Sequence, residues 1–219
     1  MNGLLKNQFY GAIGSFFILL AFFIFTGIIL LITGNPTLLT FFAVVATIAF
    51  TFNATASLRK EASSNWSKYE LTTPVRRKDV TKSRYINHAI WAMFGIILSA
   101  FFVGLTVAIH GNLYFYHTVR DPLMLFCIGT GVALLTGSLF YPSIYFFGTD
   151  KSEILMIISL LGAAGITAGM IWLLNAAYSF KPMTDFQFYI TTAIYMATVI
   201  ISFVLSYFLT TYIFNRKEY

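Results

Sequence analysis

The sequence predicts an all-α integral membrane protein with six transmembrane helices, cytoplasmic N and C termini, and a short cytoplasmic helix between the second and third helices. Three observations lead to this prediction. The chain is 58% hydrophobic with a mean hydropathy of +0.77, which leaves too little polar surface to cover a water-soluble globule. Its apolar residues form continuous runs, whereas the strands of a membrane barrel alternate. Its charged residues lie between these runs.

Six apolar runs have the length of a transmembrane helix, which needs roughly 20 residues to cross the hydrocarbon core. They cover residues 15–33, 37–55, 87–109, 122–147, 154–176 and 189–214. The first run is expected to stay as a membrane helix, because its apolar core is longer than that of a signal peptide and no small-residue cleavage site follows it. The segment before it, residues 4–12, has near-helical apolar spacing and forms either an interfacial turn or a frayed end.

The basic residues predict the orientation of the chain, because cytoplasmic loops of membrane proteins are enriched in Lys and Arg. With the N-terminus inside, twelve of the fourteen basic residues lie in cytoplasmic segments, and eight of them lie in residues 56–86. Arg120 and Lys181 remain on the outer side. Both termini are therefore expected in the cytoplasm.

None of the 22 Asp, Glu, Lys and Arg residues falls within a predicted span. Carriers driven by protons or sodium usually place ionisable groups at membrane depth, where they bind and release the driving ion. This pattern disfavours an ion-coupled carrier. Coupling through hydroxyl and carbonyl groups stays open, because the spans contain Thr47, Thr130, Thr136, Ser138 and Thr167.

The chain also lacks a nucleotide site of its own. A phosphate-binding loop requires a Gly-Lys pair, and the sequence contains none. The largest cytoplasmic segment, residues 56–86, is too short for a nucleotide-binding domain. If this protein works on a substrate, its energy comes from a partner.

The loop 56–86 contains half of the charged residues of the chain together with aromatic residues. Ser64 is a suitable N-cap for a short helix that ends near Leu71. Thr73 with Pro74 is typical of the start of a second helix, which is expected to lead through Val75, Val80 and Tyr85 towards the third span. The loop could simply set topology and contact anionic lipid headgroups. Amphipathic helices with aromatic anchors are, however, suited to the groove of a partner protein.

The stretch WSKYELTTPVRRKDVTKSRYI, residues 66–86, resembles the signature of small bacterial type-2 ATP-binding-cassette (ABC) permeases. The matching residues are Trp66, Tyr69, Leu71, Pro74, Val75, Arg77, Lys78, Asp79, Val80, Arg84 and Tyr85. The opening MNGLLKNQFY and the six-span layout also fit this family, so residues 1–219 are expected to form a single transmembrane permease domain. Three features depart from the family pattern: Glu61 is the only carboxylate of the lead-in, Thr73 replaces Leu, and Arg76 replaces Ser.

The resemblance implies that the helix before Pro74 is a coupling helix, which rests on a separate cytoplasmic ATPase subunit. Trp66, Lys68, Tyr69, Glu70 and Leu71 would face that ATPase, and Pro74, Arg77, Lys78 and Asp79 complete the expected coupling site. ATP and Mg²⁺ would bind to the partner ATPase, and this chain would be a non-catalytic subunit that binds no cofactor or metal directly.

Spans rich in Phe, Ile and Leu and free of fixed charge favour an apolar or amphipathic cargo. Within the family the sequence is most similar to permeases of Gram-positive bacteria, including the staphylococcal exporters of phenol-soluble modulins, which implies peptide export through the bacterial plasma membrane. Family members work in pairs, as a homodimer or a heterodimer. The small residues Gly162, Gly165 and Gly169 allow close helix packing, either within one subunit or across a dimer seam.

Other candidate sites are weaker. His110 and His117 lack a third metal ligand nearby, His88 is expected to form interfacial hydrogen bonds, and the lone Cys127 cannot form an intrachain disulfide. No catalytic constellation and no nucleic-acid partner are expected. Three functions remain open: the membrane subunit of an ATP-driven exporter, a self-contained channel or ion-coupled carrier, and a non-transporting scaffold or immunity protein.

Overall fold

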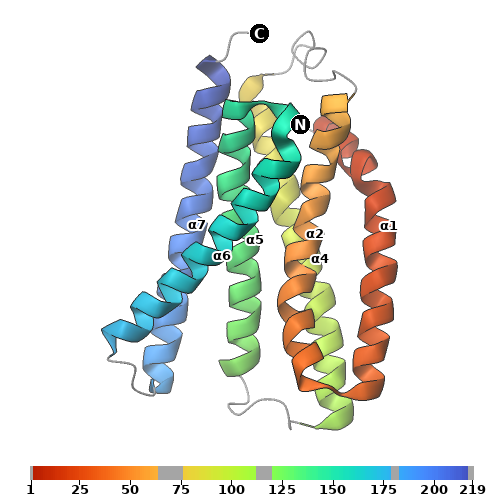
Figure 1. The fold of residues 1–219 in the computed structure, drawn as a ribbon, viewed down its shortest axis with the longest axis vertical. Helices are drawn as coiled ribbons and strands as arrows, with labels where there is room; N and C mark the ends of the chain where they lie inside the picture. Colours follow the sequence, from red (N-terminus) through yellow and green to blue (C-terminus); the bar gives the residue numbers. More distant parts are fainter. Residues whose placement is uncertain (1, 64–75, 112–119, 179–182, 217–219) are drawn as a thin grey trace.

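The structure, a computed structural model, describes residues 2–63, 76–111, 120–178 and 183–216, and these form a bundle of long helices (Figure 1). The helices are α1 (Asn2–Thr33), α2 (Pro36–Ser63), α4 (Arg77–His110), α5 (Arg120–Phe147), α6 (Ser152–Ala177) and α7 (Asp185–Arg216), with a 3-10 turn, η1 (Thr149–Lys151), before α6. Each of the six long helices contains a segment long and apolar enough to cross a membrane, and no strand occurs in the ranges described. The predicted all-α membrane fold is confirmed.

Both ends of the chain lie at the same end of the bundle, and α4 begins there too (Figure 1). The distribution of basic residues assigns this end to the cytoplasm. The helices extend beyond the apolar runs of the sequence. In particular, α4 begins at Arg77, ten residues before the third predicted span, so several charged residues belong to the base of a membrane helix.

Local sequence signals fix where the helices end. Gly34, Gly111 and Gly148 follow the last residues of α1, α4 and α5 with φ angles of 56°, 77° and 97°, a conformation that favours glycine. Asn35 caps the next helix, because its Oδ1 accepts hydrogen bonds from the backbone N–H groups of Thr37 and Leu38 at 2.9 and 3.2 Å.

The start of α7 is held by a reciprocal capping box. The backbone N–H of Gln187 donates to Thr184 Oγ1 at 3.4 Å, and the backbone N–H of Thr184 donates to Gln187 Oε1 at 3.0 Å. The sequence Thr-x-x-Gln is a known form of this motif. It sets the position of Asp185, the first residue of α7.

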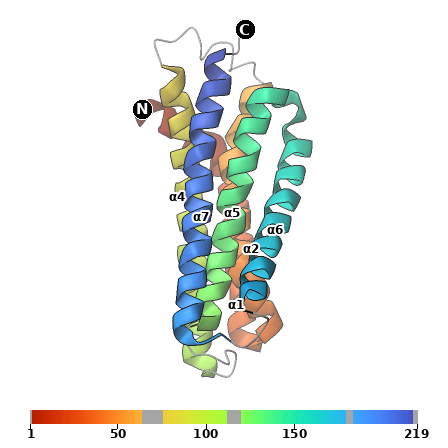
Figure 2. The ribbon, with the colours of Figure 1, turned by 90° about the vertical axis from the view of Figure 1, so that its left-hand side faces the viewer.

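The helices pack as two groups that meet along α2 and α5. Helix α2 contacts α1, α4 and α5, and α5 contacts α6 and α7. Helix α6 leans away from the bundle towards the end opposite to the chain termini, and few contacts join it to α7 (Figures 1 and 2). The core of the first group is largely aromatic; it includes Phe16, Phe23, Phe42, Phe50, Phe94 and Phe102, whose neighbouring ring centroids lie 5.1 to 6.3 Å apart.

Small residues bring α2 and α4 close together. A Cβ at Gly95 would lie 2.8 Å from the Cα of Thr47, so only glycine fits there. One turn further along α4, the hydroxyl of Ser99 donates to the carbonyl of Ala43 at 3.1 Å. Residues 43 and 47 of α2 thus lie beside residues 99 and 95 of the antiparallel α4.

Candidate functional site

The structure describes one part of the predicted coupling site. Trp66, Lys68, Tyr69, Glu70, Leu71 and Pro74 lie outside the described residues. Arg77, Lys78 and Asp79 form the first turn of α4, directly after that segment. The candidate site is therefore considered at the cytoplasmic base of α4 and the side chains that it contacts.

Arg77 joins the first turn of α4 to the last turn of α7. Its guanidinium donates to the carbonyls of Phe214 at 2.8 Å and Asn215 at 3.3 Å, and it lies over the Phe214 ring at 5.4 Å from the centroid. The last carbonyls of a helix lack partners within the helix and carry partial negative charge. Arg77 therefore stabilises the C-terminal end of α7.

The two neighbours of Arg77 have different environments. Lys78 is exposed, so its ammonium group is accessible to a partner from the cytoplasm. Asp79 is half-buried in the first turn of α4, where its negative charge interacts favourably with the positive end of the helix dipole.

Arg84, two turns further along α4, is buried with 7% of its side chain exposed. Its Nη1 donates to the hydroxyl of Tyr145 at 2.6 Å, and its guanidinium carbon lies 5.1 Å from the centroid of that ring. A buried guanidinium needs such partners, because its transfer from water is costly. This pair fastens α4 to the cytoplasmic end of α5.

His88, one turn above Arg84, is 1% exposed. Its Nε2 lies 2.9 Å from the carbonyl of Ala133, which can only accept, so Nε2 carries a proton and donates. The hydroxyl of Tyr141 lies 3.4 Å from His88 Nδ1 and 3.3 Å from the carbonyl of Arg84. Gly137 makes this arrangement possible, because a Cβ there would lie 2.8 Å from His88 Nε2.

Tyr85 connects the same region of α4 to α7. Its hydroxyl lies 2.7 Å from Ser206 Oγ and 2.8 Å from Thr210 Oγ1. Ser206 in turn donates to the carbonyl of Ser138 in α5 at 2.6 Å. A continuous chain of hydrogen bonds therefore runs from α4 through α7 to α5.

Four further buried polar residues belong to α2 and α4. Thr47, Asn53, Asn87 and Trp91 are at most 2% exposed, and their side-chain polar atoms have no hydrogen-bond partner among the described residues. Thr47 lies beside Gly95 of α4, whereas the Trp91 ring stacks on the Phe9 ring of α1 with centroids 5.0 Å apart. We call these four residues the α2–α4 seam.

The glycines of α6 differ in what surrounds them. A Cβ at Gly162 would lie 3.1 Å from Leu139 of α5, so this glycine serves packing within the chain. A Cβ at Gly165 or Gly169 would meet no other atom of the described chain within 4 Å. Packing inside one subunit therefore does not account for these two glycines.

The site contains the elements of a mechanical connection. Buried side chains of α4 are hydrogen-bonded to both α5 and α7, and the exposed start of α4 follows a long polar segment.

The family model that describes ABC-2 family transporter proteins matches residues 3–215 of the sequence. The chain belongs to this family. No curated protein and no solved structure matches it.

As an ABC-2 family member, the chain is a permease component of an ABC transporter and a multi-pass membrane protein, and its family implies a cytoplasmic ATPase as its partner. Such permease subunits are generally non-catalytic.

The sequence pointed to Arg84, Tyr85 and His88 as residues of interest, but not to their partners Tyr141, Tyr145 and Ser206. The helical spacing of Arg84, His88 and Trp91 was a usable signal, because polar residues on one face of an apolar helix indicate buried contacts.

Proposed function

We propose that this ABC-2 permease is the membrane subunit of an ATP-driven exporter, and that residues 56–86 receive force from the ATPase and pass it to the membrane helices through the base of α4. The observation that carries this proposal is the connection from α4 to α5 and α7 directly after that segment: Arg77 to Phe214, Arg84 to Tyr145, and Tyr85 to Ser206.

The transmission follows from the stiffness of α4. A displacement of its first turn moves Arg77 and Arg84 together, because they lie two helical turns apart on one rigid element. Their partners lie on two different helices, so α5 and α7 are displaced with α4. ATP and Mg²⁺ bind to the partner subunit in this proposal, and the driving force enters this chain only as motion.

The α2–α4 seam fits a permease that changes conformation. Buried polar atoms without partners are uncommon in a protein with a single packing arrangement, and they cost free energy. We assign these residues to a part of the bundle that repacks during transport, so that Asn53 and Asn87 gain water or new partners in the other state.

The cargo is an apolar or amphipathic molecule. The large hydrophobic side chains that the described spans expose are mainly Phe, Ile and Leu, which interact favourably with apolar surface. Together with the resemblance to permeases of Gram-positive bacteria, this supports export of amphipathic peptides such as phenol-soluble modulins through the bacterial plasma membrane. Gly165 and Gly169 support a second permease subunit packed against α6.

A second candidate, a proton-coupled carrier, is favoured by one observation. His88 is buried within a helix that crosses the membrane, and an imidazole at such depth can take up and release protons. Flux driven by a proton gradient through the chain reconstituted alone would support this alternative.

The coupling proposal is tested with Trp66→Ala and Tyr69→Ala in the chain coexpressed with the ATPase from its own genome. We expect the ATPase to copurify with the unaltered chain, and cargo to stimulate ATP hydrolysis. Both variants should abolish this stimulation while they leave the permease folded. Trp172→Ala is the matched control, because Trp172 is 60% exposed and lies in the last two turns of α6, at the end of the bundle opposite to the coupling segment. Equal stimulation in all three variants would contradict the proposal.

A further inference from the structure

A cavity of about 310 Å³ lies between α5, α6 and α7, at the end of the bundle opposite to the chain termini (Figure 1). Its volume lies at the lower end of the range of about 300–1,000 Å³ for small-molecule sites. Much of its wall is apolar and consists of Met124, Cys127, Ile128, Ile171, Leu174, Met183 and Phe188. The cavity therefore suits a small apolar ligand or the apolar part of a larger one.

Tyr195 closes the cavity at the end that lies deeper in the bundle. Its hydroxyl lies 3.4 Å from Thr167 Oγ1, so α7 and α6 touch at this level. Gly131 of α5 leaves room for this side chain, because a Cβ there would collide with the Tyr195 hydroxyl. From Tyr195 back to Phe188, about two turns or roughly 10 Å of α7 line the cavity. Along this stretch α6 leans away from α7 (Figure 1).

The space between α6 and α7 is continuous with the lipid-facing surface of the protein. Both helices contain a segment long and apolar enough to cross a membrane, and few contacts join them. Residues next to the cavity wall in the sequence have exposed apolar side chains, namely Trp172 and Leu173 of α6 and Tyr189 and Ile190 of α7. The cavity is partly open, so its open side meets the hydrocarbon of the bilayer.

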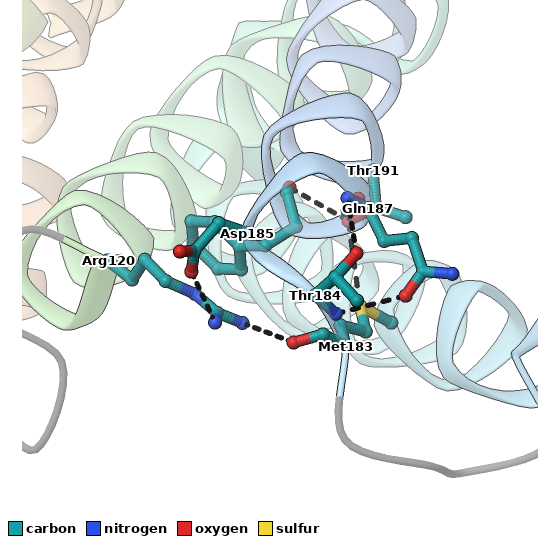
Figure 3. A network of polar contacts seen from close by, with 7 residues as sticks. Arg120, Met183, Thr184, Asp185, Gln187 and Thr191 are labelled. Carbon is teal, nitrogen blue, oxygen red and sulfur yellow. Dashed lines mark hydrogen bonds and ion pairs between the residues drawn. The ribbon is translucent and has the colours of Figure 1, made fainter.

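Several polar side chains of the wall are engaged within the protein. Arg120 Nη1 forms an ion pair with Asp185 Oδ1 at 2.8 Å, and the same guanidinium donates to the carbonyl of Met183 at 3.3 Å (Figure 3). The hydroxyl of Thr191 donates to the carbonyl of Gln187 at 2.9 Å. These groups have partners without a ligand, and they do not call for a polar group inside the cavity.

The chain near the outer rim of the cavity carries both signs of charge. Arg120 and Asp121 belong to the first turn of α5, and Asp185 is the first residue of α7. Lys181 precedes Met183 in the sequence and lies outside the described residues. Two basic and two acidic residues thus occur here, and neither sign of charge predominates. Recognition at this site is therefore expected to depend on hydrocarbon and not on the charge of a head group.

We propose that this cavity holds one acyl chain of a phospholipid from the bilayer leaflet opposite to the chain termini. The chain enters between α6 and α7, lies against Ile128 and Leu174, and ends at Tyr195. An empty apolar space would forfeit dispersion contacts along its wall, whereas the bilayer supplies hydrocarbon at its opening. The proposal does not depend on the exporter function, because the site belongs to the permease alone and its test needs neither ATPase nor ATP.

Cys127 provides the measurement, because it is the only cysteine of the chain and it lines the cavity. The full-length chain is purified in glyco-diosgenin, a detergent with a rigid steroid skeleton instead of a flexible chain. The rate at which methyl methanethiosulfonate modifies Cys127 is then measured as tetradecanoyl-lysophosphatidylcholine is added. At ten times its dissociation constant this lipid should slow modification about tenfold, because only the empty cavity reacts.

Two related lipids separate the roles of chain and head. The hexanoyl homologue should bind at least tenfold more weakly, because each buried methylene group contributes about fourfold in affinity. Tetradecanoyl-lysophosphatidylglycerol has the same chain and an anionic head, and its dissociation constant should lie within about threefold of that of the choline lipid, since the rim has no predominant charge.

Substitutions in the wall locate the bound chain. Leu174→Trp and Ile128→Trp fill the cavity from two different helices, and each should abolish the dependence of the modification rate on lipid. Leu173→Trp, at the next residue of α6 but with an exposed side chain, is the matched control and should keep this dependence. The melting temperature of each variant shows that it is folded, and having two filling variants keeps the test decisive if one of them is unstable.

Three results would overturn the proposal. The first is equal protection by the hexanoyl and tetradecanoyl lipids, or a preference of more than tenfold for one head group. The second is lipid-dependent protection that survives both Leu174→Trp and Ile128→Trp. The third is protection that rises with the concentration of the permease and not with that of lipid, which would place a second copy of the chain in the cavity.

Discussion

The buried guanidinium of Arg84 carries a cost that its surroundings must offset. Tyr145 provides a hydroxyl acceptor and an aromatic face, so one residue satisfies a donor and stabilises the positive charge. This contact stabilises the arginine beside apolar helices.

The Tyr145→Phe variant tests this pairing. It keeps the aromatic face but removes the acceptor at 2.6 Å, which should lower the free energy of unfolding by about 1–3 kcal/mol. We expect a lower melting temperature in detergent and weaker coupling of ATP hydrolysis to transport. Tyr189→Phe, at a residue that is 46% exposed, is the control and should behave like the unaltered chain. Equal melting temperatures for the two variants would argue against a structural role of the Arg84–Tyr145 contact.

Gly137 provides a second test at the scale of single residues. A methyl group there would lie 2.8 Å from His88 Nε2, so Gly137→Ala must displace the imidazole from the Ala133 carbonyl. We expect a loss of about 1–3 kcal/mol in the free energy of unfolding, as for other overpacked sites. Gly104→Ala, where the added Cβ meets nothing within 4 Å in the described chain, should not destabilise the protein. Thermal unfolding of both variants, followed by circular dichroism, makes the comparison.

At the scale of elements, the sequence predicted the six membrane helices because each needs a long apolar run, and hydropathy measures that directly. Hydropathy did not show that α4 extends to Arg77, because charged residues extend a helix without adding to its hydropathy. Thr73 with Pro74, however, predicted a helix that leads into the third span, and α4 begins three residues after Pro74. The Thr184–Gln187 capping box has a sequence signal, the Thr-x-x-Gln spacing, which indicates a helix start at this point. The burial of His88 depends on the space at Gly137 of another helix, which one sequence cannot reveal.

The contact between α4 and α7 gives a prediction about an element. Arg77→Ala removes the cation from the last carbonyls of α7, and such an interaction contributes about 0.3–2 kcal/mol. Hydrogen exchange of amides near Phe214 should therefore become several-fold faster. Lys78→Ala is the matched control, because Lys78 is the next residue of α4 and its side chain is exposed. Unchanged exchange in Arg77→Ala would show that this contact does not hold the end of α7.

At the scale of the whole molecule, a Cβ at Gly165 or Gly169 of α6 would meet no described atom within 4 Å, which leaves room for the close approach of a second subunit that we propose. Gly165→Leu and Gly169→Leu should leave the melting temperature of the isolated chain nearly unchanged, because a Cβ at either position would point into open space, with no described atom within 4 Å. They should reduce the dimer fraction if close helix approach forms the seam. Single-molecule photobleaching in vesicles measures this fraction, with Gly104→Leu on α4 as the control. A dimer fraction equal to that of the control would place the seam elsewhere.

The central claim is that the chain converts the closure of a partner ATPase into movement of its own helices. The most direct test is uptake of a fluorescent amphipathic peptide into sealed vesicles that contain the permease with the ATPase, or the permease alone. We predict uptake against the gradient only when ATPase, ATP and Mg²⁺ are all present on the outside of inverted vesicles, and its loss in Trp66→Ala. Uphill uptake by the permease alone would contradict the account.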